Sequence, residues 1–133
     1  MVIHLLHSNI CKQIIFGLFS FLGSTAYAAN MIEISQNELT KADNTPFLLI
    51  DVRSEKEFAD GHVPQAINIP LDKIAAHPDI LNISKDMPII LYCRSGYRAN
   101  KAGNILWQNG YTNLRHLKGD MLAWEKSGLP IEK

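Results

Sequence analysis

The residues best suited to chemistry lie in one short stretch of this 133-residue chain, residues 92–98, which reads YCRSGYR. Cys93 follows an apolar run, and Arg94 and Arg98 stand on either side of Gly96. The thiolate is the reactive form of cysteine, and it is stabilised by nearby positive charge, by a helix N-terminus and by converging backbone N–H groups. Glycine lets a loop turn so that such groups converge. The stretch therefore predicts a loop that holds an anion, either the thiolate itself or an anionic substrate beside it.

These residues also have a plainer interpretation. A lone cysteine after an apolar strand is commonly a small buried hydrophobic residue, and either arginine by itself could be a solvated loop charge. The glycine between the two arginines, directly after the thiol and at the start of a helical pattern, favours the reactive interpretation of Cys93.

The elements that must position this loop are indicated by apolar runs and helix caps. Capping-box patterns at Ser35 and Ser54 predict two short helices. Strands alternate with helices along the chain, which predicts an α/β fold with a mainly parallel sheet. Sites in such sheets form at the carboxyl ends of the strands, where Asp51 and Cys93 both lie. We expect strands within residues 31–34, 46–53, 65–70, 87–93 and 112–119, and the longest helix at 98–109.

The composition is that of a globular protein, with 47% hydrophobic and 20% charged residues and no net charge. Nucleic-acid binders and proteins of anionic membrane surfaces need an excess of positive charge. We therefore expect neither kind of partner for this chain.

The N-terminal residues 1–28 are predicted to be a signal peptide. An apolar run at residues 14–23 precedes Ala26-Tyr27-Ala28, which has the small-x-small pattern of a cleavage site. The run is shorter than the roughly 20 residues of a membrane-spanning helix, although an uncleaved anchor stays open. Cleavage after Ala28 predicts a periplasmic or secreted protein with no stable membrane association. Cys11 would be lost, so the thiol of Cys93 could form no internal disulfide.

Several sequence blocks resemble the landmarks of a rhodanese domain. They occur in family order and spacing across about residues 31–131, and the nearest likeness is to single-domain, exported thiosulfate sulfurtransferases. The resemblance implies a rhodanese-like α/β fold, a five-stranded, mainly parallel sheet with helices on both faces. It implies no metal and no organic cofactor. The blocks are IDVRSEKEFADGHVPQAINIPL at residues 50–71, YCRSGYR at 92–98, NGYTNLRHLKGD at 109–120 and AWEKSGLP at 123–130.

The same resemblance implies the chemistry. Cys93 would take a sulfane sulfur from thiosulfate or a similar anionic donor and pass it, through a persulfide, to cyanide or a thiol. A protein could also be the acceptor. Asp51 and Arg53 match the family's DVR motif and would support the loop, His62 would be structural, and Trp107 and Trp124 would be core or interface residues. The substrate-binding loop would consist of Arg94, Ser95, Gly96, Tyr97 and Arg98.

Two other functions remain open. Tyrosine phosphatases and arsenate reductases of related fold wrap a phosphate with a longer loop than the four residues between Cys93 and Arg98, which disfavours that chemistry. A non-catalytic module that carries or senses sulfur for a partner would share the same sequence. In addition, Asp120 stands where the family often has a second glycine, which is expected to alter the loop beside the site.

Overall fold

The structure, a computed structural model, describes residues 29–42 and 45–133. The predicted signal peptide lies outside the described residues. Within the part of the chain that is described, no helix is long and apolar enough to cross a membrane.

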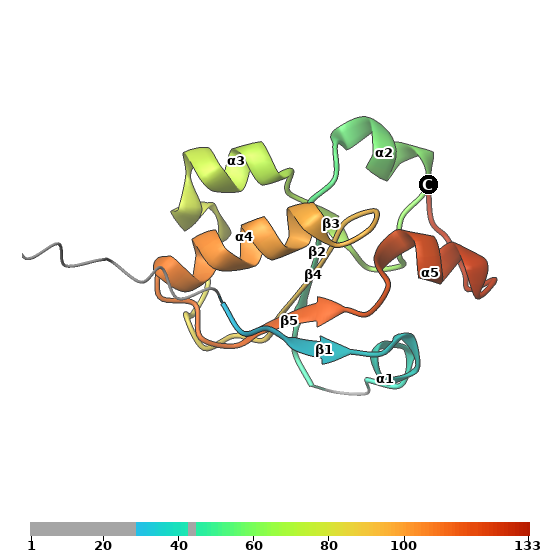
Figure 1. The fold of residues 1–133 in the computed structure, drawn as a ribbon, viewed down its shortest axis with the longest axis horizontal. Coiled ribbons are helices and arrows are strands. Elements are labelled where there is room, and N and C mark those ends of the chain that lie inside the picture. The colour runs from blue at the N-terminus through green and yellow to red at the C-terminus, as the bar shows by residue number, and fades with distance from the viewer. Residues whose placement is uncertain (1–28, 43–44) are drawn as a thin grey trace, which may run out of the picture.

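A single five-stranded sheet organises the domain, with the strand order β1-β5-β4-β2-β3 (Figure 1). Every pairing within it is parallel, so the predicted α/β fold is confirmed and the sheet is parallel throughout rather than mainly. Parallel neighbours require crossover connections, and helices provide them here. The strands are β1 (Ile32–Ile34), β2 (Leu48–Asp51), β3 (Ile67–Asn68), β4 (Ile89–Tyr92) and β5 (Leu114–Leu117).

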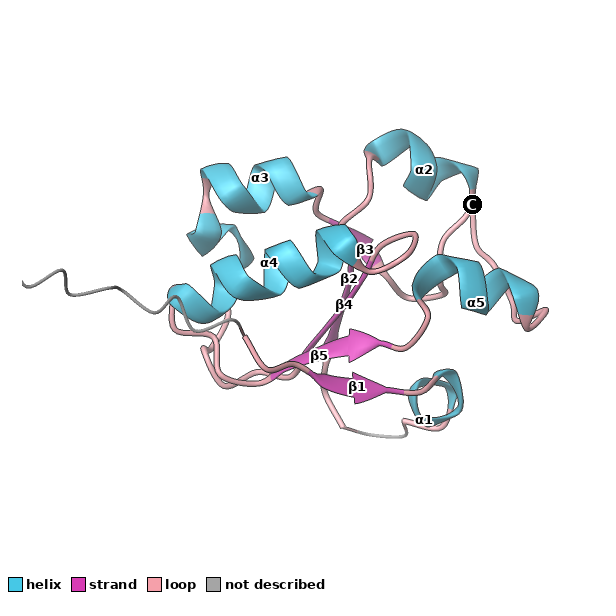
Figure 2. Ribbon diagram, in the orientation of Figure 1, coloured by secondary structure: helices cyan, strands magenta, loops and turns pink. Residues whose placement is uncertain are grey.

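Helices cover both faces of the sheet, as Figure 2 shows. One apolar cluster joins α3 and α4 to the sheet, and a second joins α1 and α5 to the opposite face. A short 3-10 helix, η1, follows α3, and the C-terminus lies beside α2. The bounds are α1 (Gln36–Thr40), α2 (Glu55–Asp60), α3 (Leu71–Ala76), η1 (Pro78–Leu81), α4 (Tyr97–Gln108) and α5 (Asp120–Lys126).

Local sequence signals account for the helix ends. Both predicted capping boxes are present, with Ser35 at the start of α1 and Ser54 at the start of α2. In each box, the glutamate three residues later accepts a hydrogen bond from the backbone N–H of the serine. Gly61 ends α2 with a φ of 153°, a conformation that glycine adopts readily. The helix predicted at 98–109 begins and ends one residue earlier, and its buried residues are mostly small: Ala99, Ala102 and Gly103, with Leu106.

Strand β4 positions Cys93, which is the residue directly after it. It lies between β5 and β2, and each of its four residues is buried, which explains its unbroken apolar sequence. The register pairs Asp51 of β2 with Tyr92 of β4. The carboxyl ends of both strands therefore meet at one edge of the sheet, with Cys93 directly after Tyr92.

The two tryptophans have different surroundings. Trp124 is buried, and its ring N–H donates to the carbonyl oxygen of Pro130 over 2.8 Å. Trp107 lies on α4 and remains 44% exposed. Trp124 is thus a core residue, whereas Trp107 contributes to the surface.

Candidate active site

Cys93 is held at the start of a tight loop between β4 and α4. Its side chain is only 1% exposed and belongs to the apolar cluster beneath α4. The backbone N–H of Gly96 donates to its Sγ atom over 3.0 Å. Gly96 has a φ of 109° and caps the N-terminus of α4, so the loop curls back over the sulfur. A buried hydrophobic role would explain the burial, but not an amide that points at the sulfur.

The outer face of the loop is open to solvent. Arg94 and Ser95 are exposed and Tyr97 is 68% exposed, whereas Gly96 is buried between them. The first turn of α4 follows immediately, and its free N–H groups carry partial positive charge. The solvent side of the loop therefore carries an exposed arginine, Arg94, and leads into the start of a helix.

Arg98 differs from Arg94 because it has a carboxylate partner. Its guanidinium donates to both carboxylate oxygens of Glu57, over 2.7 and 2.9 Å. These hydrogen bonds are the main reason why the pKa of Glu57 falls from 4.5 to about 2. Glu57 also completes the capping box of α2. Arg98 therefore ties the start of α4 to α2, and its charge is shared with a neighbour.

Asp51 and Arg53 form a buried ion pair behind the loop. Their closest atoms, Oδ2 and Nη2, are 2.7 Å apart, and the side chains are 0% and 5% exposed. The same Nη2 donates to the carbonyl oxygen of Gly61 over 2.7 Å. The pair thereby links the end of β2 to the end of α2, and the supporting role expected for it stays a prediction.

Asp120 contacts the loop from below, at the start of α5. It is 2% exposed, and its Oδ1 accepts the backbone N–H of Cys93 over 2.9 Å. Its φ of 55° lies in the left-handed region, which aspartate tolerates better than most residues. The N–H of Met121 donates to the carbonyl oxygen of Cys93 over 3.0 Å. Asp120 thus occupies the position expected to alter the loop, and it holds the cysteine backbone.

His116 is a residue near the site that sequence reasoning missed. Its Nε2 lies 3.1 and 3.0 Å from the two carboxylate oxygens of Asp120. The hydrogen bond to Asp120 is the main cause that raises the pKa of His116. His116 and Asp120 are four residues apart in the sequence. They come into contact because the chain bends between β5 and α5, and the sequence does not show this bend.

The remaining candidates have structural contacts. The ring of His62 stacks on Phe58 with centroids 3.6 Å apart, and Nδ1 lies 2.9 Å from the carbonyl oxygen of Phe58. In residues 29–42 and 45–133, no group of three or more histidine, cysteine, aspartate or glutamate side chains could hold a metal ion.

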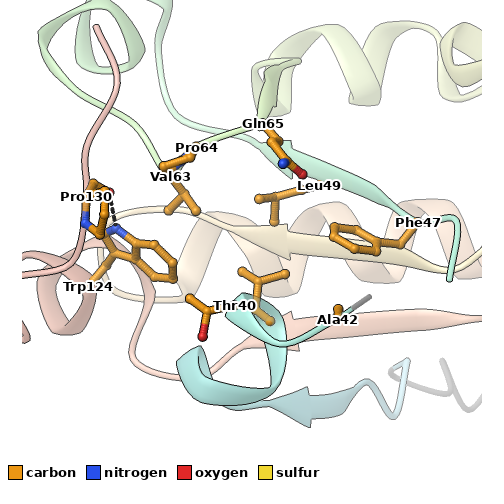
Figure 3. Close-up of a pocket in the computed structure, with 10 residues that line it drawn as sticks. Thr40, Ala42, Phe47, Leu49, Val63, Pro64, Gln65, Trp124 and Pro130 are labelled. Atoms are coloured by element: carbon orange, nitrogen blue, oxygen red, sulfur yellow. Dashed lines mark hydrogen bonds between the residues drawn. The ribbon is translucent and has the colours of Figure 1, made fainter. Parts of the chain in front are cut away.

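An apolar pocket of about 330 Å³ lies on the α1 and α5 side of the sheet (Figure 3). Phe47, Val63 and Trp124 line it, and the loop of Cys93 does not. This pocket and the side chain of Cys93 are therefore on different faces of the sheet, and the cysteine loop is the better candidate because it offers chemical groups.

A model of the family "Rhodanese-like domain" matches residues 35–127. The chain belongs to the rhodanese-like domain family. It is 38% identical over 101 residues to a protein of Allochromatium vinosum named sulfurtransferase, a match that covers 74% of this chain and 92% of that protein.

Solved structures agree with this family. A rhodanese-like domain protein from Staphylococcus aureus is 34% identical, with a TM-score of 0.64, over 77% of this chain and 100% of that one. The thiosulfate sulfurtransferase of Pseudomonas aeruginosa is 25% identical with a TM-score of 0.70, over 77% of this chain and 20% of that one.

Proposed function

We propose that this protein is a sulfurtransferase that moves a sulfane sulfur from thiosulfate, or a similar anionic donor, to a thiophilic acceptor through a persulfide on Cys93. The observation that carries the proposal is the Gly96 N–H at 3.0 Å from the Cys93 sulfur, at the N-terminus of α4. An amide in this place stabilises a negatively charged sulfur. The names of the Allochromatium and Pseudomonas relatives support the same chemistry.

In the first half-reaction, the Cys93 thiolate attacks the outer sulfur of thiosulfate. A new sulfur–sulfur bond forms to Cys93, and the old bond breaks with its electron pair leaving on sulfite. Arg94, which is exposed and follows Cys93 directly in the chain, would bind the sulfonate end of the donor. No oxidant is required, because the sulfane sulfur has the same oxidation state in thiosulfate and in the persulfide.

In the second half-reaction, cyanide or a thiolate attacks the outer sulfur of the persulfide. The electron pair of the breaking bond returns to Cys93, which becomes a thiolate again, and thiocyanate or a new persulfide is released. Gly96 and the start of α4 would stabilise the anion on sulfur in both steps. The remaining loop residues, Ser95, Tyr97 and Arg98, would shape the opening, and the buried Asp51–Arg53 pair would brace it.

A sulfur carrier or sensor is the second candidate, and the 1% exposure of Cys93 is the observation that favours it. A shielded persulfide would survive until a partner protein opened the loop. The two candidates differ in turnover with small acceptors.

Intact mass spectrometry tests the proposal. After incubation with thiosulfate, the protein should gain one sulfur atom at Cys93, and cyanide should remove it with release of thiocyanate. Absence of the gain would refute sulfur transfer from thiosulfate. A gain that cyanide removes only in a single slow turnover would instead support the carrier.

We also propose that residues 1–28 are removed after Ala28 and that the remaining domain is periplasmic or secreted. The support is the apolar run before the Ala26-Tyr27-Ala28 pattern. Expression of the full gene in a Gram-negative host should give soluble protein that begins at Ala29. Soluble cytosolic protein that retains Met1 would contradict export.

A further inference from the structure

His116 lies directly beneath the loop of Cys93, although the proposed reaction gives it no role. A Cβ atom added to Gly96 would lie 3.4 Å from Cε1 of His116 and 3.2 Å from Oδ2 of Asp120. Gly96 is also the residue whose N–H binds the sulfur. The imidazole and the carboxylate therefore lie against the same glycine that holds the sulfur.

Asp120 has two effects on a sulfur anion in this loop. Its carboxylate fixes the backbone of Cys93 by accepting the N–H over 2.9 Å. The carboxylate is also a negative charge that is 2% exposed, so water screens it poorly from a thiolate or persulfide close by. Positioning and repulsion therefore come from the same group, and a positive charge next to Asp120 would offset the repulsion.

The imidazolium form of His116 is such a charge, with Nε2 at 3.0 and 3.1 Å from the two carboxylate oxygens. We propose that His116 is a positioning residue for sulfur transfer, whose protonated ring balances Asp120 and so lets this carboxylate hold the Cys93 backbone without repelling the sulfur anion. The inference rests on the proposed function for its consequence in sulfur transfer, whereas the charge coupling can be measured without that reaction.

Two carboxylate residues lie near His116. Asp120 contacts it from the start of α5, and Glu33 is its register partner on the neighbouring strand β1. Asp120, chiefly by its hydrogen bond, and Glu33 at longer range both raise the pKa of His116. Its imidazolium therefore persists to higher pH than that of a free histidine and is lost as the pH rises through the raised pKa.

The test compares His116→Gln with His77→Gln as a matched control. Glutamine at 116 retains an N–H that can donate to Asp120 but carries no charge, and His77 is exposed at the end of α3, away from the loop. Alkylation of Cys93 by iodoacetamide is followed against pH. We expect the midpoint to move up by about one pH unit in His116→Gln, which is about a ten-fold change in the thiolate equilibrium, and not to move in His77→Gln.

Sulfur loading from thiosulfate is measured on the same proteins. Wild type should lose rate at alkaline pH as His116 loses its proton, and His116→Gln should be about ten-fold slower at pH 7 and lack this alkaline decline. Unchanged alkylation in a folded His116→Gln protein would overturn the role of His116. If wild type takes up no sulfur but the alkylation midpoint shifts as expected, the proposed function fails while the charge coupling is upheld.

Discussion

The link between Glu57 and Arg98 gives a prediction whose size and pH range follow from the structure. In Glu57→Gln, the new side chain can still complete the capping box of α2, but it cannot form the charged pair with Arg98. A pKa lowered from 4.5 to about 2 corresponds to roughly 3 kcal/mol at full strength. Because the Arg98 and Glu57 side chains are 32% and 33% exposed, water screens the pair. We therefore expect a loss of about 1–2 kcal/mol in the free energy of unfolding at pH 7.

The sign of the pH dependence follows from the lowered pKa. Glu57 is ionised in the folded and unfolded protein above about pH 4.5, so the pair stabilises fully there, and this contribution is lost as the pH falls toward 2. The difference between wild type and Glu57→Gln in urea unfolding, followed by the fluorescence of buried Trp124, should therefore shrink below pH 4.5. Glu55→Gln is the control, because Glu55 is 71% exposed in its pair with Lys73. A difference that is independent of pH, or an equal loss in Glu55→Gln, would refute the reasoning.

Three further predictions concern the loop itself. Cys93→Ser should abolish sulfur transfer yet unfold within about 1–2 kcal/mol of wild type in urea, because no cross-link is lost; residual transfer would exclude Cys93 as the carrier of sulfur. Arg94→Ala should lower kcat/KM for thiosulfate by about 10- to 150-fold, the size of one lost charge-assisted hydrogen bond. Cyanide attack on a preformed persulfide should change less, and unchanged thiosulfate kinetics would leave Arg94 a solvated charge. Gly96→Ala and Gly110→Ala should each lose about 1–2 kcal/mol of stability from their positive φ. Sulfur loading should fail only in the former, where the new Cβ meets Asp120 at 3.2 Å; equal loading rates would show that the loop tolerates the change.

The fold was predictable because its signals are local. Each capping box involves residues three positions apart, and each buried strand shows its burial as a continuous apolar run. A chain in which such strands alternate with helices can adopt few topologies, and most of these contain a parallel sheet. Even the carboxyl-end position of Cys93 follows from knowing where β4 stops. The strand ends were predicted too generously, since β2 occupies only Leu48–Asp51 of the expected 46–53.

The partners of the loop were not predictable in the same way, because packing brings them together over long stretches of chain. Glu57 is 41 residues from Arg98, and Asp120 is 27 residues from Cys93. From the sequence, both arginines looked equally available to a donor, and Asp120 looked like a departure from a glycine position. An aspartate there can take the left-handed conformation and still offer a carboxylate to a backbone N–H. The loop roles assigned from the sequence therefore stay predictions, now with named contacts to test.

These partners change how the loop should be understood as an anion site. Arg98 is paired with Glu57, and Asp120 would be balanced in the same way by His116 when its ring is protonated. What remains to attract an anion is exposed Arg94 together with the Gly96 N–H and the start of α4. Such a site can hold a sulfur anion without binding donor and product so firmly that release becomes slow, since backbone amides contribute direction without full charge. Turnover, as opposed to storage of sulfur, would then depend on how readily the loop admits an acceptor to a sulfur that is 1% exposed.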